Sequence, residues 1–210
     1  QYITGYTEFY GRRLSVSPQV LIPRQETERV VDVALDCLTG FTKPKILEIG
    51  TGSGCISIAI AKERADSDIL SVDISQYALT KAQYNANINN INNVTFSKLD
   101  FMKELPDKRF DLIISNPPYI SKNEMNTIML DVREFEPDIA LTDNHDGLEF
   151  YRRFCNTIKQ LINKKGFMVL EVGLGKHPIK AYNIFHSAGF DQLELIPDYN
   201  NDLRVLKIEI

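Results

Sequence analysis

Residues 46–54 read Ile-Leu-Glu-Ile-Gly-Thr-Gly-Ser-Gly, an apolar strand with one glutamate that runs directly into three alternating glycines. The apolar stretch over 55–61 predicts a helix, so the glycines form the turn between a strand and a helix. Glycine lets the backbone turn sharply and approach a ligand that a Cβ atom would exclude. In an open α/β sheet such a turn lies at the carboxyl edge, where ligands bind. The sequence therefore predicts a ligand site at this loop.

The spacing of the glycines separates two classes of ligand. A dinucleotide fingerprint has the form G-x-G-x-x-G, but Cys55 occupies its third glycine position and Gly54 comes one residue early. The spacing therefore disfavours pyrophosphate, and with it a nicotinamide oxidoreductase. The form G-x-G-x-G after an acidic strand end resembles the first motif of S-adenosylmethionine-dependent enzymes, in which the loop holds the methionine and ribose parts of the cofactor. The alternative is a tight strand-to-helix turn without a ligand.

Acidic residues also end the next two predicted strands. Asp73 is placed where a carboxylate accepts both ribose hydroxyls of a nucleoside; the alternative is a helix N-cap, although Ser75 already offers one. By resemblance, Asp100 or a neighbouring backbone group recognises adenine and Phe101 packs on its ring, with core packing as the alternative. Glu48 either orients the amino group of the cofactor or braces the loop. The predicted cofactor-binding residues are Glu48, Gly50, Thr51, Gly52, Gly54, Asp73, Asp100, Phe101 and Asn116.

Strands and helices alternate along the chain, which predicts right-handed crossovers and a mostly parallel sheet. Strands are expected at 45–49, 69–73, 94–99, 110–115, 166–172, 192–196 and 203–208. Helices are expected at 55–63, 75–88, 148–162 and 178–187, after a first helix that begins at Glu26 and ends before Gly40. Residues 19–24 read as a strand or an extended arm, because Pro23 disfavours helix before it. Only a turn at 198–202 separates the last two strands, so a hairpin there inserts one antiparallel strand.

A second motif, Asn116-Pro117-Pro118-Tyr119, follows the apolar strand predicted over 110–115 and reaches the same sheet edge. Two consecutive prolines fix φ and remove two N–H donors, which leaves the Asn116 amide oxygen and the Pro117 carbonyl as rigid acceptors. An amide or aromatic amino nitrogen is a poor nucleophile because its lone pair is delocalised. Two acceptors that hold its N–H bonds aim the nitrogen at a sulfonium methyl and stabilise the positive charge that develops on it.

The catalytic residues predicted from this motif are Asn116, Pro117 and Tyr119, and the substrate contacts are Asn116, Pro117, Pro118 and Tyr119. Tyr119 is expected to close over the planar group and exclude solvent. No side-chain base is required, because an N-methylated amide cation is strongly acidic, and no histidine lies near the motif in the sequence. The alternative is a rigid turn after a strand.

Composition narrows the class of protein further. The 210 residues suffice for one sizeable core, and the net charge of −4 provides no general attraction to duplex phosphates. Three widely spaced cysteines (Cys37, Cys55 and Cys155) predict neither a disulfide framework nor a zinc site, which fits a reducing cytoplasm. The apolar runs are of strand length and the first residues lack a signal pattern, so neither a membrane span nor secretion is supported.

With the motif at 116–119, the sequence resembles the HemK/PrmC family, the peptide-chain release factor glutamine N5-methyltransferases, over essentially the whole chain. The resemblance implies a class I S-adenosylmethionine-dependent methyltransferase (Rossmann-like) α/β fold. Its sheet is seven-stranded and mostly parallel, with one antiparallel strand and helices on both faces. It also implies transfer from S-adenosyl-L-methionine to the Gly-Gly-Gln glutamine of class 1 release factors, leaving S-adenosyl-L-homocysteine. A cytoplasmic monomer that requires no membrane and no nucleic acid is expected.

The resemblance also divides the chain. Residues 1–24 correspond to an interdomain linker and an extended arm, and 25–210 to the methyltransferase domain, while the small N-terminal helical domain that the family uses to hold its substrate is expected to be absent. Pro137 and Gly147 predict a long loop after the motif, which could cover the target side chain. Arg24, Glu136 and Arg204 fit a structural ion network as well as any other role.

Three rival functions remain at this point. A glutamine methyltransferase acting on a ribosomal protein would use the same motif, and sequence physics does not separate the two. An N6-adenine methyltransferase would need a basic groove and a base-flipping pocket, neither of which is evident. A cofactor-sensing or scaffold domain without turnover is disfavoured because both motifs are intact.

Overall fold

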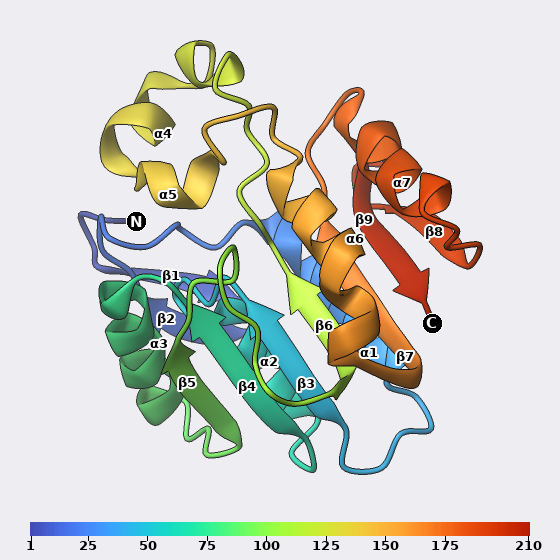
Figure 1. The fold of residues 1–210 in the computed structure, drawn as a ribbon. Coiled ribbons are helices and arrows are strands. Elements are labelled where there is room, and N and C mark those ends of the chain that lie inside the picture. The colour runs from blue at the N-terminus through green and yellow to red at the C-terminus, as the bar shows by residue number, and fades with distance from the viewer.

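A twisted seven-stranded sheet forms the centre of the computed structural model, which describes residues 1–210 (Figure 1). Its strands are β3 (Lys45–Ile49), β4 (Asp68–Asp73), β5 (Val94–Lys98), β6 (Phe110–Ser115), β7 (Ile162–Glu171), β8 (Leu193–Pro197) and β9 (Leu203–Glu209). They lie in the order β5-β4-β3-β6-β7-β9-β8, and β9 alone runs antiparallel to its neighbours. The predicted sheet, with its single antiparallel strand, is confirmed.

Helices cover both faces of this sheet, so its inner strands are apolar on both sides. The helices α1 (Glu28–Cys37), α2 (Cys55–Glu63) and α3 (Gln76–Ile88) cover one face, and α6 (Glu149–Leu161) and α7 (His177–Ser187) cover the other. Two clusters of 21 and 20 buried residues fill the two layers. None of the helices combines the length and the hydropathy needed to cross a bilayer.

The predicted bounds of β3, β6 and α2 agree with the structure residue for residue. The strand expected over 166–172 instead begins at Ile162, because Ile162 pairs with Phe110 before a register shift. The polar residues in between resemble a loop in the sequence but lie at this irregular part of the ladder. The first helix begins later than Glu26, after the 3-10 turn η1 (Gln25–Thr27).

A β-hairpin near the N-terminus is not predicted from the sequence. The strands β1 (Tyr6–Phe9) and β2 (Arg12–Ser15) pair through a two-residue turn, where Tyr10 and Gly11 have φ of 49° and 67°. Phe9 and Leu14 are buried in the larger cluster. Residues 1–24 therefore include a segment that packs into the domain, and 19–24 form an arm outside any strand.

The long loop predicted after the motif at 116–119 contains short helical turns. These are η2 (Glu124–Asn126), α4 (Leu130–Phe135) and α5 (Asp138–Leu141). In Figure 1 the segment lies beyond the carboxyl end of β6, close to the N-terminal arm. It is therefore placed above the sheet edge at which the predicted site lies.

Gly54 makes the turn into α2 at φ +81°, and a Cβ atom there would lie 3.0 Å from the Ala82 Cβ of α3. Gly54→Ala should lower the free energy of unfolding by about 1–3 kcal/mol, because it adds a clash to the backbone strain. Gly40→Ala is the matched control: φ is +86°, with no atom near the new Cβ, so only strain of about 1 kcal/mol is expected. Urea unfolding measures both variants, and equal losses would contradict this packing role of Gly54.

Candidate functional site

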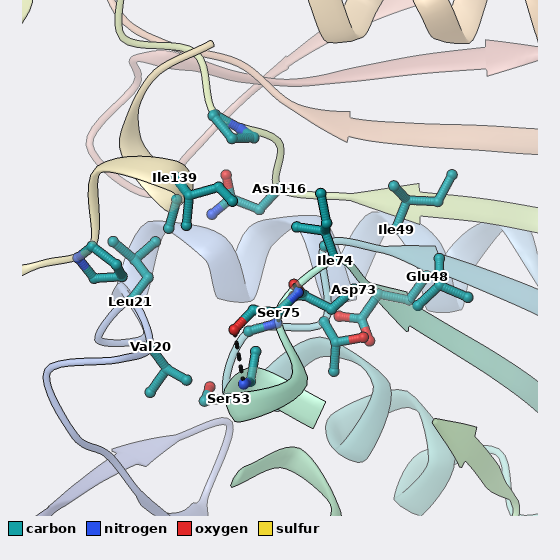
Figure 2. Close-up of a pocket in the computed structure, with 18 of the residues that line it drawn as sticks. Val20, Leu21, Glu48, Ile49, Ser53, Asp73, Ile74, Ser75, Asn116 and Ile139 are labelled. Carbon is teal, nitrogen blue, oxygen red and sulfur yellow. Dashed lines mark hydrogen bonds between the residues drawn. The ribbon is translucent and has the colours of Figure 1, made fainter. Parts of the chain in front are cut away.

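A cavity of about 310 Å³ lies at the carboxyl edge of the sheet, between the glycine loop, the end of β4 and the residues after β6. The arm over 19–24 and α5 complete its walls. In Figure 2, Asn116 lies beside Ile139, while Asp73 and Ser75 project from the end of β4. The predicted residues that line the cavity are Glu48, Gly50, Thr51, Gly52, Asp73, Asp100, Phe101, Asn116 and Pro118. Gly54, Pro117 and Tyr119 do not line it.

The glycine loop is held against the end of β4 by its own backbone. The amides of Gly50 and Thr51 donate to the carbonyl of Val72 at 2.9 and 3.1 Å. The amide of Gly52 donates to Oδ2 of Asp73 at 2.9 Å. These bonds fix the loop as a rigid floor of the cavity.

Glu48 is a buried carboxylate with one oxygen that has no hydrogen-bond partner in the chain. It is 1% exposed, and Oε2 accepts a hydrogen bond from the Ser71 hydroxyl, which also bonds Thr51 Oγ1 at 2.7 Å. Oε1 has no hydrogen-bond partner within the chain. Burial raises the pKa of Glu48 to about 7. A buried oxygen without a partner on the cavity wall can accept a hydrogen bond from an ammonium group. Glu48 therefore fits the amino group of an amino-acid-like cofactor.

Asp73 and Asp100 lie further along the same wall. Asp73 Oδ1 accepts from the Ser75 amide at 2.8 Å, and burial raises its pKa. The Ser75 hydroxyl caps α3 by accepting from the Ala78 amide at 3.3 Å (dashed in Figure 2), as the sequence predicted. Asp100 forms an ion pair with Lys103 at 2.8 Å, which lowers the pKa of the carboxyl. The wall is therefore acidic and suits a ligand that carries positive charge.

Phe101 is 4% exposed, and its ring packs against Phe154 with the centroids 4.7 Å apart. The core interpretation of Phe101 is therefore confirmed. Because it also lines the cavity, its contact with adenine stays a prediction.

Asn116 presents its carboxamide at the edge of the cavity with a defined orientation. Nδ2 donates to the Thr27 hydroxyl at 3.2 Å, and Thr27 in turn donates to Oε2 of Glu171 at 2.6 Å. The Asn116 Oδ1 and the Pro117 carbonyl accept no hydrogen bond within the chain. Neither predicted acceptor is therefore occupied within the chain, while the donor end of the amide is bound; Asn116 lines the cavity and Pro117 does not.

Tyr119 does not close over the cavity as predicted. Its hydroxyl donates to Oε1 of Glu171 at 3.2 Å, and its ring packs near His177, with the centroids 5.8 Å apart. Gly147 lies directly against it, since a Cβ there would be 2.3 Å from the Tyr119 carbonyl oxygen. The side chain is turned toward the interior because Glu171 offers a buried acceptor, which the sequence around 116–119 does not reveal.

One histidine lies close to the motif in space, although none does in the sequence. His177 accepts a hydrogen bond from the Gly173 amide at Nδ1, 3.1 Å away, so Nε2 carries the proton and donates to the Gly147 carbonyl at 2.9 Å. Burial lowers the pKa of His177. Both ring nitrogens are engaged, so His177 fixes the loop and is not a free base.

The charged residues whose roles the sequence left open form two separate ion pairs. Arg24 contacts both carboxylate oxygens of Glu136 at 2.7 Å and so ties the N-terminal arm to the segment that contains α4 and α5. Arg204 pairs with Asp198 at 3.2 Å at the turn between β8 and β9. The sequence also left the role of Glu171 open, and it assigned no role to Thr27. The signal for Glu171 is the acidic end of β7, which parallels Glu48 near the end of β3.

Comparison with known proteins agrees with this geometry. A family model described as "Methyltransferase small domain" matches residues 25–133. The release factor glutamine methyltransferase of Fusobacterium nucleatum is 39% identical over 207 residues, which cover 98% of this chain and 58% of that protein. The enzyme of the same name from Rhodopirellula baltica is 37% identical over 99% of this chain and 72% of its own length. The chain belongs to the release factor glutamine methyltransferase family.

Solved structures place the fold of this family member among the methyltransferases. A methyltransferase from Pyrococcus furiosus has a TM-score of 0.65 at 18% identity and covers 95% of this chain and 89% of its own. The catalytic domain of hMettl16, solved in complex with MAT2A 3'UTR hairpin 6, has a TM-score of 0.72 at 14% identity, covering 95% of this chain and 76% of its own. At these identities the likeness concerns the fold alone. The predicted class I methyltransferase fold is confirmed.

The raised pKa of Glu48 predicts a pH dependence of stability. The unfolded chain ionises Glu48 near its ordinary pKa of 4.5, whereas the folded chain keeps the proton up to about pH 7. The stability that this group contributes is therefore fully present below pH 4.5 and is lost as the pH rises through 7. Glu48→Gln should flatten the fall in the free energy of unfolding over this range, as measured by urea unfolding without cofactor. Parallel pH curves for the two proteins would contradict the assignment.

Proposed function

We propose that this chain transfers the methyl group of S-adenosyl-L-methionine to the side-chain amide nitrogen (N5) of a glutamine in the Gly-Gly-Gln motif of a class 1 peptide-chain release factor. The products are N5-methylglutamine and S-adenosyl-L-homocysteine. The observation that carries the proposal is the free Asn116 Oδ1 beside the glycine loop, with Nδ2 already bound by Thr27. The names of the relatives, which specify glutamine and release factors, favour this substrate over a ribosomal protein or adenine.

The acidic wall of the cavity supports the choice of cofactor. Glu48 Oε1 would hold the ammonium group of the methionine part, and the Asp73 carboxylate the ribose hydroxyls. Asp100, or a backbone group beside it, would recognise adenine. When bound, the cofactor supplies an electrophilic methyl group on a positively charged sulfur. The negative side chains of the cavity favour that charge.

Asn116 and Pro117 would activate the substrate without a base. Their two carbonyl oxygens accept the two N–H bonds of the glutamine amide and hold its nitrogen in line with the methyl group. Positive charge grows on this nitrogen as its conjugation is lost, so the two acceptors bind the transition state more strongly than the ground state. The N-methylated amide cation then loses a proton to water.

The segment over 120–147 would shield this reaction from solvent. The Arg24–Glu136 ion pair holds the segment against the N-terminal arm, and Ile139 and Pro137 present apolar surface to the cavity. Excluding water strengthens the electrostatic contacts inside the site. Tyr119 contributes from behind the cavity wall, through Glu171. We propose that the chain acts in this way as a cytoplasmic monomer, without a nucleic acid.

The test is to incubate the chain with labelled cofactor and purified release factor and to localise the methyl group by tandem mass spectrometry. We expect one methyl group on the glutamine of the Gly-Gly-Gln motif, and none when this glutamine is replaced by glutamate, which has no amide nitrogen. Asn116→Ala should lower kcat by about a hundredfold to a thousandfold, because one transition-state acceptor is lost. Its cofactor affinity, measured by calorimetry, should change by no more than about twofold.

Two outcomes would contradict the proposal. Methyl transfer to another residue, to a ribosomal protein alone or to nucleic acid would exclude the proposed substrate. Equal loss of methyl transfer and cofactor binding in Asn116→Ala would exclude the role of Asn116.

A further inference from the structure

An asparagine can hold a substrate amide in the proposed way only in one of its two orientations. Its side chain carries an acceptor at Oδ1 and two donors at Nδ2. The substrate glutamine presents N–H donors, so Oδ1 must face it. A carboxamide rotated by half a turn would direct its own donors at the N–H bonds of the substrate and repel them. Some part of the protein must therefore set this orientation before the substrate binds.

Thr27 is placed to set it, because its hydroxyl bonds the side chains of Asn116 and Glu171 and no backbone group. Its hydroxyl lies 3.2 Å from Asn116 Nδ2, and the residue is 2% exposed. Thr27 ends the 3-10 turn η1 directly before α1, and its φ of −66° and ψ of −20° are helical, whereas a residue that caps a helix is extended. Here it makes no capping bond. The hydroxyl is therefore left for the side chains of Asn116 and Glu171.

Glu171 determines which way the Thr27 hydroxyl points. A hydroxyl has one proton, and Thr27 directs it at Oε2 of Glu171, 2.6 Å away. The lone pairs of Thr27 are then the groups that face Asn116, so they select Nδ2. The other oxygen of Glu171 accepts from the Tyr119 hydroxyl. Both carboxylate oxygens are satisfied, which holds Glu171 in place.

The burial of the Glu171 carboxylate lowers the stability of the fold, so packing alone does not explain this residue. It is 1% exposed and contacts two hydroxyl groups, whereas the nearby cation Arg204 pairs with Asp198. Burial raises its pKa to about 7. Buried acids with perturbed pKa values concentrate at functional sites. The position of Glu171 behind Thr27 and Tyr119 connects it to both ends of the motif at 116–119.

We infer that Thr27 and Glu171 are positioning residues, which hold the Asn116 carboxamide with its oxygen toward the substrate. This inference rests on the proposed function and adds to it a relay of hydrogen bonds from Glu171 through Thr27 to Asn116. Neither residue lies in the motif itself: Thr27 precedes α1 and Glu171 ends β7. The relay thus joins the first helix of the domain to the residues after β6.

Thr27→Val tests the relay, because it removes the hydroxyl and nearly preserves the shape. The expected result is a fall in kcat of about tenfold to a hundredfold, with the cofactor affinity unchanged, since Asn116 is misoriented but present. Thr27→Ser keeps the hydroxyl and should restore the rate to within about threefold. Thr157→Val is the matched control, because Thr157 is also buried but its hydroxyl bonds the Arg153 carbonyl within α6. This control should leave kcat unchanged even if it lowers stability.

A second measurement separates the inference from the proposed substrate. In nitrogen-15 spectra without substrate, Thr27→Val should shift the side-chain NH2 signals of Asn116, and Thr27→Ser should not. Unchanged Asn116 signals in Thr27→Val, or a kcat loss matched by Thr157→Val, would overturn the inference. If the signals shift as expected but the native chain transfers no methyl group to a release factor, the relay is supported and the proposed substrate is excluded.

Discussion

The parallel pairing of β3 with β6 brings the two halves of the site together. Ile49 lies opposite Ser115 in the ladder, and the Ser115 hydroxyl donates to the Ile49 carbonyl at 2.6 Å. The strands end side by side, so the glycine loop and the motif at 116–119 leave the sheet at adjacent points. A Cβ atom at Gly50 would lie 3.8 Å from the Asn116 carbonyl oxygen. One register therefore places both the proposed cofactor floor and the proposed substrate clamp, and the other residues of the site surround this contact.

Two buried glutamates flank this contact in similar ways. Glu48 near the end of β3 and Glu171 at the end of β7 are each bound by a hydroxyl, from Ser71 and Thr27 respectively. Burial raises the pKa of both to about 7, so both acids cost stability at neutral pH. Oε1 of Glu48 has no partner within the chain, whereas both carboxylate oxygens of Glu171 accept hydrogen bonds. These two buried acids thus lower the stability of the fold at the place where the proposed reaction requires fixed hydrogen-bond acceptors.

The sequence predicted those strands and turns that depend on the local pattern of apolar residues and glycines. Apolar runs, each with one acidic residue, located β3 and β6. The spacing of Gly50, Gly52 and Gly54 located the loop between β3 and α2, and the structure gives all three a positive φ. It missed features that depend on distant partners. The β1–β2 hairpin is held in part by the Ser15 amide, which donates to Asn85 at 2.7 Å, 70 residues away. Tyr119 turns inward because Glu171, 52 residues later, accepts its hydroxyl. Neither contact leaves a trace in local composition or periodicity.

In the proposed mechanism, Asn116 and Pro117 hold the amide nitrogen of the substrate. A crystal structure with S-adenosyl-L-homocysteine and a glutamine-containing release factor peptide tests this contact. The mechanism requires the glutamine nitrogen to lie within about 2.7–3.2 Å of both the Asn116 Oδ1 and the Pro117 carbonyl oxygen, on the side facing the sulfur. A glutamine nitrogen bound elsewhere, or an Asn116 oxygen rotated toward Thr27, would contradict it.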